Sequence, residues 1–326
     1  MRLTAEGGAL DGRVRQAPGG APSRHVPDVL VRFDPQPAGG AAATSLPLIF
    51  DSPHSGTTYP RDFGYAAPLD LLRRAEDAFV DELFAAAPAH GAGLLAALFP
   101  RSYIDPNRHE ADIDVTLLDG AWPHTLAPTK RSRRGMGLIR RILKGDLPVY
   151  DRKLSVAEVK ARIDNYYRPY HAELEAMLDA AHGSWGQVWH VNCHSMRALG
   201  RKPGDPPFGG EGRPRADFVL GDLDGEACDA DFRETVRQAL VGLGYRVVLN
   251  KPFKGAELVS RYSDPRAGRH SLQIEINRRL YMDERKVEKT AEFERLQADI
   301  ERLIVAITGY VRERVAATQS HKDEMD

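Results

Sequence analysis

The sequence predicts a three-layer α/β fold around a mostly parallel mixed sheet. Short apolar runs typical of buried strands alternate with longer segments of helical periodicity, a pattern that indicates helices packed on both faces of a sheet. Polar side chains follow several of these runs directly, at the positions where open α/β sheets bind ligands. With 326 residues, the chain is long enough for one large domain with a sizeable core.

Residues 1–45 are expected to form a loosely structured N-terminal arm. They include 8 Ala, 7 Gly and 5 Pro and have almost no apolar periodicity. Such a segment buries too little surface to offset its loss of chain entropy. One short strand is expected within it, near residues 29–33. The single hydrolase-type α/β domain is therefore expected over residues 46–313.

Several short apolar segments are expected to be the strands of the sheet, because their lengths are those of buried strands. They are residues 46–50, 94–99, 187–193, 217–220, 246–250 and 271–276. The last one alternates strictly, so that Gln273, Glu275 and Asn277 share one face. This polar row is typical of a half-exposed edge strand, but it would equally line an active site, and the pattern alone does not decide between the two.

Segments with helical periodicity are expected to cover the sheet, and they are residues 69–87, 156–181, 231–243 and 293–310. Pro169 is expected to interrupt the second of these helices. In the first, Asp77 and Asp81 lie four residues apart and are expected on one face. Residues 110–155 are rich in Arg, Gly and Pro and are expected to be an irregular insertion over one edge. The polar residues 314–326 are expected to be a frayed tail.

Composition excludes several classes of protein. The 45 Lys and Arg residues nearly balance the 46 Asp and Glu residues, so the strong positive charge that nucleic-acid binders use is absent. No apolar run is long enough to span a membrane, and the N-terminus lacks the apolar core of a secretory signal. Cys193 and Cys228 are too few for a disulfide framework. A cytoplasmic protein with a small-molecule partner is expected, of undetermined oligomeric state.

Chemically useful residues collect just after the predicted strands. His54 follows the first, Arg101 and then Asn107 and Arg108 follow the second, His194 ends the third, and Lys254 follows the fifth. Because the carboxyl ends of parallel strands meet at one edge of the sheet, we expect these side chains to approach one another. This clustering is the main functional signal in the sequence.

A metal site is the natural interpretation of His54 together with His194, although either histidine alone is more typical of a hydrogen-bonded loop residue. Imidazole is the commonest zinc ligand, and catalytic zinc takes three protein ligands. Glu76, Asp77 and Asp81 are the candidates for an acidic third ligand, unless these acids only complement a helix dipole. His190 does not belong to this set, because four residues of strand separate it from His194 by about 13 Å.

Arg108 and Asn107 are typical of a substrate clamp, because a guanidinium binds a carboxylate through two hydrogen bonds and a neighbouring amide adds a donor. Arg101 is either a second clamp or part of a surface salt bridge. Glycine loops that bind nucleotides and the serine-hydrolase elbow are both absent from the sequence.

Ordered motifs give the chain a specific resemblance. SPHSGTTYP, EDAFVDELF, RSYIDPNR, YHAEL, NCHSM, ADFVLGD, NKPFKG and HSLQIEINRRLYMDE follow one another as in the N-formylglutamate amidohydrolase family, over residues 46–312. The resemblance implies a fold similar to the zinc-dependent exopeptidases, one Zn²⁺ per chain and hydrolysis of an N-formyl or related N-acyl acidic amino acid. It also implies a place in histidine degradation.

The resemblance also implies roles for particular residues. His54 and His194 would be zinc ligands, and Glu275 would be the general base. Asn107 and Arg108 would bind a substrate carboxylate, with Arg101 and Lys254 as further candidates for this role. Zinc carboxypeptidases have a Glu ligand three residues after the first His, where this chain has Thr57. Asp77 is therefore expected to be the acidic ligand, as in zinc amidases of related architecture.

Two alternatives to this function stay open. One is another zinc amidase or deacylase of similar fold. Within this class, the missing export signal argues only against enzymes that act on the cell wall. The other is a non-enzymatic binding protein on a decayed hydrolase scaffold, which the retention of His54, His194, Arg108 and Glu275 disfavours.

Overall fold

The structure is a computed structural model that describes residues 21–36, 45–143, 146–200 and 212–323. Its centre is an eight-stranded sheet in the order β1-β2-β4-β3-β7-β10-β8-β9. The strands are β1 (Arg24–Val26), β2 (Leu30–Phe33), β3 (Leu48–Ser52), β4 (Gly93–Ala97), β7 (Val188–Met196), β8 (Phe218–Gly221), β9 (Val247–Leu249) and β10 (Arg269–Asn277). Parallel pairs join β4 to β3, β3 to β7, β7 to β10 and β8 to β9, and the other neighbours are antiparallel.

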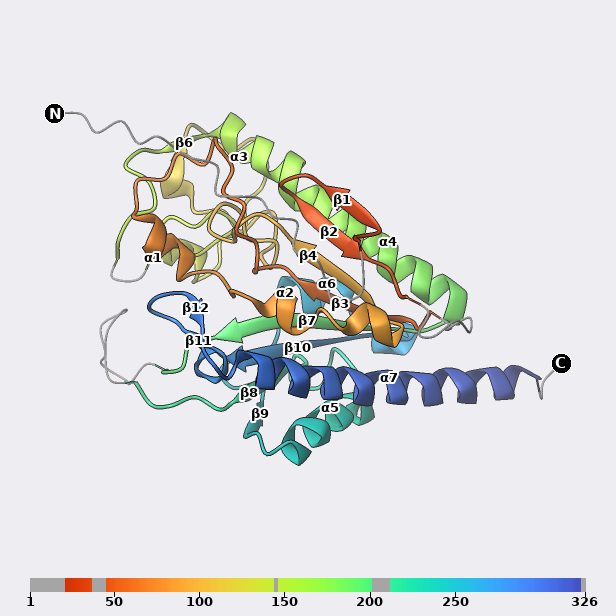
Figure 1. Ribbon diagram of the computed structural model, residues 1–326. Helices are drawn as coiled ribbons and strands as arrows, with labels where there is room; N and C mark the ends of the chain where they lie inside the picture. The colour runs from red at the N-terminus through yellow and green to blue at the C-terminus, as the bar shows by residue number, and fades with distance from the viewer. Residues whose placement is uncertain (1–20, 37–44, 144–145, 201–211, 324–326) are drawn as a thin grey trace.

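Helices cover both faces of the sheet, which completes the predicted three layers (Figure 1). One face carries α3 (Val156–Arg162), α4 (Arg168–Trp185) and α6 (Glu257–Tyr262), and the other carries α2 (Val80–Leu83), α5 (Ala230–Gly242) and α7 (Phe293–Asp323). The mixed, mostly parallel sheet confirms the predicted fold class. Among the described residues, no helix combines the length and the apolar character needed to cross a membrane.

The core is divided into two apolar clusters, one on each face of the sheet. Alternate residues of a strand point to opposite faces, and β7 shows the consequence. Trp189 and Cys193 pack into the cluster under α7, whereas His190, Asn192 and His194 lie buried on the face that α4 covers. A row of polar groups is thus enclosed in the interior of the molecule, where each needs a hydrogen-bond partner.

Four parallel strands bring candidate residues to one edge of the sheet. β3 leads into His54, β4 leads into Arg101, β7 carries His194 near its end, and β10 carries Glu275 near its end. The expected convergence at the carboxyl edge is confirmed for His54, Arg101 and His194. β10 lies between β7 and β8 and its residues are buried, so the edge-strand interpretation of its polar row is wrong.

Part of the expected N-terminal arm belongs to the sheet. The strand expected near residues 29–33 is β2, which pairs with β4 and is extended by β1. Its apolar residues are buried against the core, which supplies the stabilisation that the segment lacks alone. The remainder of the arm, residues 1–20 and 37–44, lies outside the described residues.

The expected helix over residues 69–87 is wrong in its middle. The structure has α1 (Leu69–Arg73), then a non-helical stretch, then α2. Phe79, just before α2, adopts a left-handed backbone conformation with φ of 66°. Asp77 lies outside both helices, so it does not share a helix face with Asp81 as the four-residue spacing predicted.

The expected frayed tail is helical, because α7 continues to Asp323. Val315 is buried, and Arg314 forms an ion pair with Asp231 on α5. These contacts extend the helix beyond its apolar periodicity. The described residues of the 110–155 insertion have little regular structure, as expected: the short pair β5 (Leu118–Asp119) and β6 (Leu154–Ser155) and the 3₁₀ turns Val115–Leu117 and Ser132–Arg134. They also contribute apolar residues to the core under α3 and α4.

Candidate metal centre and active site

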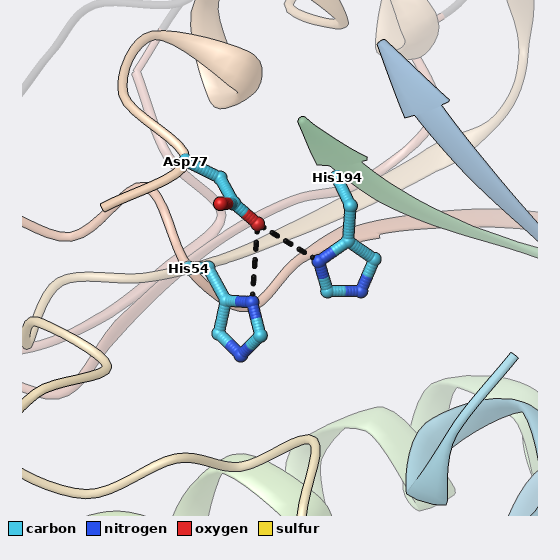
Figure 2. Close-up of side chains that lie close together, drawn as sticks. All are labelled: His54, Asp77 and His194. Carbon is cyan, nitrogen blue, oxygen red and sulfur yellow. Dashed lines mark hydrogen bonds and ion pairs between the residues drawn. The ribbon is translucent and has the colours of Figure 1, made fainter. Parts of the chain in front are cut away.

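Three side chains from separate segments meet at the carboxyl edge of the sheet. His54 comes from the turn after β3, His194 from β7 and Asp77 from the break between α1 and α2 (Figure 2). One ligand atom from each lies within 4.8 Å of the others, and all three residues are buried. The Asp77 N–H donates to the His54 carbonyl at 3.0 Å, so the two loops fix each other. This group can hold a metal ion.

Asp105 orients the imidazole of His54. The Nε2 of His54 lies 2.7 Å from Oδ1 of Asp105. Burial raises the pKa of Asp105, but Arg101 and His54 outweigh burial and hold it well below the usual value. An ionised carboxylate only accepts hydrogen bonds, so Nε2 donates to Asp105 and the ring is held with Nδ1 facing Asp77.

Asn192 orients the imidazole of His194 in the same way. The Nδ2 of Asn192 donates to Oδ1 of Asp51 at 2.8 Å, which turns the amide oxygen of Asn192 toward His194. Nε2 of His194 donates to that oxygen at 2.7 Å. This contact turns Nδ1 of His194 toward Asp77, and Nδ1 lies 3.0 Å from Oδ2 of that carboxylate.

The chemistry of this donor set fits a cation. The Nδ1 atoms of His54, at 3.2 Å, and of His194, at 3.0 Å, both face Oδ2 of Asp77. Burial raises the pKa of Asp77, but Arg101 and the two histidines outweigh it and hold this pKa well below the usual value. Two imidazole nitrogens and an ionised carboxylate that face one another in a buried site are the donor types that zinc and related divalent ions bind.

Arginines hold the other oxygen of Asp77. A guanidinium nitrogen of Arg278 donates to Oδ1 of Asp77 at 2.8 Å, and Arg101 lies 3.5 Å from the same atom. Arg278 is buried and also donates to Oγ of Ser195. Oδ2 of Asp77 is thereby left to face the histidines, which is the orientation that a metal ligand requires.

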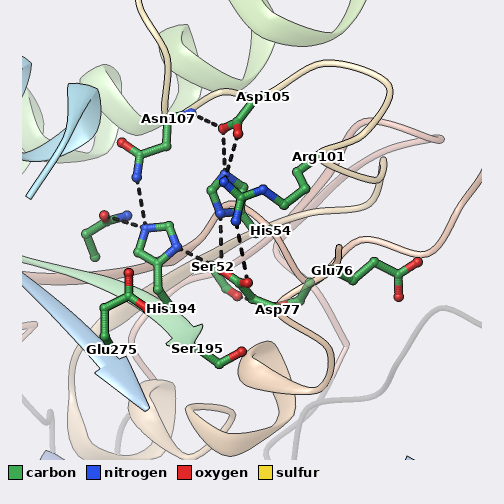
Figure 3. Close-up of polar contacts among 12 residues, drawn as sticks. Ser52, His54, Glu76, Asp77, Arg101, Asp105, Asn107, His194, Ser195 and Glu275 are labelled. Atoms are coloured by element: carbon green, nitrogen blue, oxygen red, sulfur yellow. Dashed lines mark hydrogen bonds and ion pairs between the residues drawn. The ribbon is translucent and has the colours of Figure 1, made fainter. Parts of the chain in front are cut away.

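Glu275 lies beside this group (Figure 3). It is paired in register with His194 across β7 and β10, and its Oε1 accepts a hydrogen bond from Gln273 at 3.0 Å. Burial, with the negative charge of Asp77, raises the pKa of Glu275 to about 7, although His194 and Arg101 oppose the shift. A carboxyl group that titrates near neutral pH is suited to accept and return a proton.

The expected carboxylate-binding residues have different surroundings. Arg108 forms no ion pair with any described residue, and its Nε is buried without a hydrogen-bond partner. Asn107 accepts from the Leu258 N–H at 3.0 Å, and its Nδ2 lies 3.1 Å from Nε2 of His194, so it braces the site.

The other two candidates are already paired with acids. Arg101 is bound to Asp105 at 2.8 Å. Lys254 is exposed and paired with Asp224, and the structure does not bring it to the group.

The structure also separates the three candidate acids. Only Asp77 lies with the histidines. Oε1 of Glu76 accepts a hydrogen bond from the Tyr59 hydroxyl at 2.6 Å, and Asp81 lies in the first turn of α2. His171, whose role was open from the sequence, bonds the Pro106 carbonyl and the Tyr262 hydroxyl instead of the histidine pair.

Sequence reasoning missed the residues that orient the ligands, namely Asp51, Asp105, Asn192 and Arg278. One signal was available for Asn192, because residues two apart on a strand share a face and Asn192 precedes His194 by two. Nothing in the pattern indicated Asp51, since its contact depends on the register between β3 and β7.

Comparisons with known proteins show what the chain is similar to. The family model described as N-formylglutamate amidohydrolase matches residues 46–282. An N-formylglutamate deformylase from Pseudomonas putida is 28% identical over 249 residues, which cover 73% of this chain and 83% of that protein. The N-formylglutamate deformylase of Pseudomonas aeruginosa is 28% identical over 279 residues, covering 83% of this chain and 96% of that protein.

Solved structures give the same result. The crystal structure of an N-formylglutamate amidohydrolase from Ralstonia eutropha is 45% identical, has a TM-score of 0.81 and covers 88% of this chain and 99% of that one. A gene product of Agrobacterium tumefaciens, Atu2144, is 17% identical with a TM-score of 0.54, over 91% of this chain and 96% of that one, and shares the fold.

Proposed function

The chain belongs to the N-formylglutamate amidohydrolase family, and on that premise we propose that it hydrolyses the formyl amide of N-formyl-L-glutamate with the help of a zinc ion held by His54, Asp77 and His194. The observation that supports the metal requirement is the convergence of the Nδ1 atoms of two buried histidines on one buried carboxylate oxygen.

When bound, zinc supplies Lewis-acid polarisation of the scissile carbonyl and makes water acidic enough to attack near neutral pH. Glu275 accepts the proton of the attacking water, because its pKa of about 7 matches that task. It then returns this proton to the amine nitrogen that leaves. Arg108 binds a carboxylate of the substrate and so holds the amide in position for the attack.

One set of variants tests this proposal. The wild type, Asp77→Asn, Glu275→Gln and the control Asp70→Asn, an exposed acid on α1, are purified without an affinity tag. Zinc is measured by mass spectrometry, and hydrolysis by the glutamate released. We expect about one zinc per chain in all but Asp77→Asn, and a fall in kcat of about 10²- to 10⁴-fold in Glu275→Gln with its zinc retained.

Each part of the proposal has its own contrary result. Full activity of Glu275→Gln would place the base elsewhere. Zinc retained by Asp77→Asn would move the acidic ligand to another residue. A wild type that holds no metal even after incubation with zinc would refute metal dependence, and a metal-loaded wild type that releases no glutamate would refute the substrate.

A further inference from the structure

Two cationic side chains beside the candidate site have no anionic partner. The arginines nearest to Asp77 are paired, since Arg101 binds Asp105 and Arg278 binds Asp77. Arg108 and Arg140, in contrast, form no ion pair and no side-chain hydrogen bond with any described residue. Sequence reasoning expected a role for Arg108 and none for Arg140.

Arg140 reaches the site from the 110–155 insertion. The Asp105 N–H donates to the Leu138 carbonyl at 2.8 Å, so the backbone two residues before Arg140 lies against the loop that carries Asp105 and Arg108. An antiparallel bridge from Met136 to Arg140 closes the turn around Leu138. This part of the insertion thus lies against the loop that carries Arg108.

The charges that act on Arg140 are those of the site itself. They come from Arg101, Asp105, Arg108 and Asp77. Burial, followed by the positive charges of Arg101 and Arg108, lowers the pKa of Arg140 to about 9, and burial also lowers that of Arg108. A desolvated guanidinium without a counter-ion is costly, and a ligand carboxylate would remove that cost while satisfying its planar donors.

We propose that Arg108 and Arg140 together form a dicarboxylate site, in which each guanidinium binds one of the two carboxylates of an N-acylated acidic amino acid. Arg140 is then the residue that distinguishes a dicarboxylate substrate from a monocarboxylate one. Asp77 and Asp105 are already compensated by Arg278 and Arg101, so the guanidinium groups of Arg108 and Arg140 are available to the anionic groups of a ligand. The inference rests on the proposed function and deepens it.

The inference is tested by changing the enzyme and the substrate, first separately and then together. kcat/KM is measured for N-formyl-L-glutamate and for its two monoamides, N-formyl-L-glutamine and N-formyl-L-isoglutamine, which replace one carboxylate each. We expect the wild type to prefer the dicarboxylate by about 10- to 100-fold over each monoamide, because each loses a charge-assisted hydrogen-bonded pair. In Arg140→Met, the ratio of kcat/KM for N-formyl-L-glutamate to kcat/KM for one of the monoamides should fall to about 1. The ratio for the other monoamide should stay as in the wild type.

Controls separate recognition from folding. Arg133→Met removes the same charge from an exposed position of the same insertion and should keep the wild-type preferences. Arg140→Lys keeps the charge without the planar fork and should fall between the wild type and Arg140→Met. Zinc content equal to that of the wild type is required of every variant compared. If Arg140→Met retains both wild-type preferences, or lowers kcat/KM equally for all three substrates, the inference is wrong.

Binding without turnover distinguishes this inference from the proposed function. Glutarate and butyrate are titrated by calorimetry into wild-type and Arg140→Met protein. A wild type that hydrolyses none of the formyl substrates refutes the proposed function. The dicarboxylate site is still supported if glutarate binds about 10-fold or more tighter than butyrate and only the wild type shows that difference, and it is refuted if the variant shows it equally.

Discussion

Asn192 joins two buried polar groups that lie on neighbouring strands. Its amide donates to Asp51 on β3 and accepts from the metal-facing His194 on its own strand. Asp51 also accepts from His190 at 2.8 Å and from the Tyr170 hydroxyl at 2.8 Å. Burial raises the pKa of Asp51, but His190, Asn192 and Tyr170 outweigh burial and lower it. The ionised carboxylate therefore fixes the amide, and the amide fixes the imidazole.

Replacing Asn192 should weaken metal binding without removing any ligand. In Asn192→Leu the Nε2 of His194 loses its acceptor, so the protonation of Nε2 and the ring orientation are no longer imposed. We expect zinc affinity to fall about 10- to 100-fold, as for other residues that orient metal ligands. Competition with a chromophoric chelator measures the affinity, and circular dichroism checks the fold.

Ser271→Ala is the matched control for this variant. Ser271 is buried on β10 and hydrogen-bonds His190, one step further from the site, so its removal should leave zinc affinity unchanged. Equal losses in both variants would show that the buried network acts through general stability instead of through His194.

At the residue scale, the sequence predicted most of the candidate site, because position after a strand is enough to place a side chain at the carboxyl edge. His54 and His194 were found in this way, whereas Glu275 came from the alternation of its strand and from the family resemblance. The contacts of Asp51 and Arg140 could not be predicted, because they depend on strand register and on the path of an irregular insertion. Neither register nor loop path leaves a periodic signal in one sequence.

The break between α1 and α2 shows why local periodicity failed at one element. The Arg278 guanidinium donates to the Arg74 carbonyl at 3.0 Å, and it also donates to the Glu76 carbonyl, so these groups are bound without a continuous helix. The Asp77 N–H is bound to His54 in the same way. Tertiary hydrogen bonds thus replace helical ones and override local propensity, which is a weak preference.

The helical segment after residue 156 supports, through a histidine, the loop that carries Asn107 and Arg108. A π-helical turn, Ile163–Tyr167, separates α3 from α4, where the sequence predicted an interruption near Pro169. On α4, the Nε2 of His171 donates to the Pro106 carbonyl at 2.9 Å, and its Nδ1 lies 2.8 Å from the Tyr262 hydroxyl oxygen. Burial, with the charge of Arg261, lowers the pKa of His171 to about 4.

This histidine should make the fold less stable in mild acid. Between about pH 6.5 and pH 4 the unfolded chain binds a proton at His171 that the folded chain does not, so the free energy of unfolding falls as the pH falls. The expected loss from pH 7 to pH 5 is about 2 kcal/mol from this residue. Urea unfolding at both pH values measures this loss of free energy, which should be smaller by that amount in His171→Gln than in the wild type.

His182→Gln provides the comparison for this prediction. His182 lies on the same helix and is partly exposed, so replacing it should leave the pH dependence as in the wild type. If His171→Gln has the same loss of stability as the wild type between pH 7 and pH 5, the imidazole is not held neutral in the folded protein.

At the scale of the whole molecule, the metal-competent group connects parts of the chain that are distant in sequence. His54 follows a strand of the sheet, Asp77 lies between two short helices, and His194 lies on a central strand. None of these ligands is brought together by local structure alone. The unfolded chain therefore lacks the site, and the free energy of metal binding adds to the stability of the folded state.

Removal of the metal should for this reason lower the melting temperature as well as the activity. With free zinc at about 100 times its dissociation constant, binding stabilises the fold by about 2.7 kcal/mol. For a chain of this size that corresponds to roughly 3 to 5 °C. Calorimetry of the zinc-loaded protein, of the protein after chelation and dialysis, and of the reconstituted protein should show a fall of this size and its recovery.

Asp77→Asn should melt at one temperature under all three treatments, because it lacks the carboxylate on which the two Nδ1 atoms converge. An equal shift in wild type and variant would mean that zinc stabilises the fold from a different site.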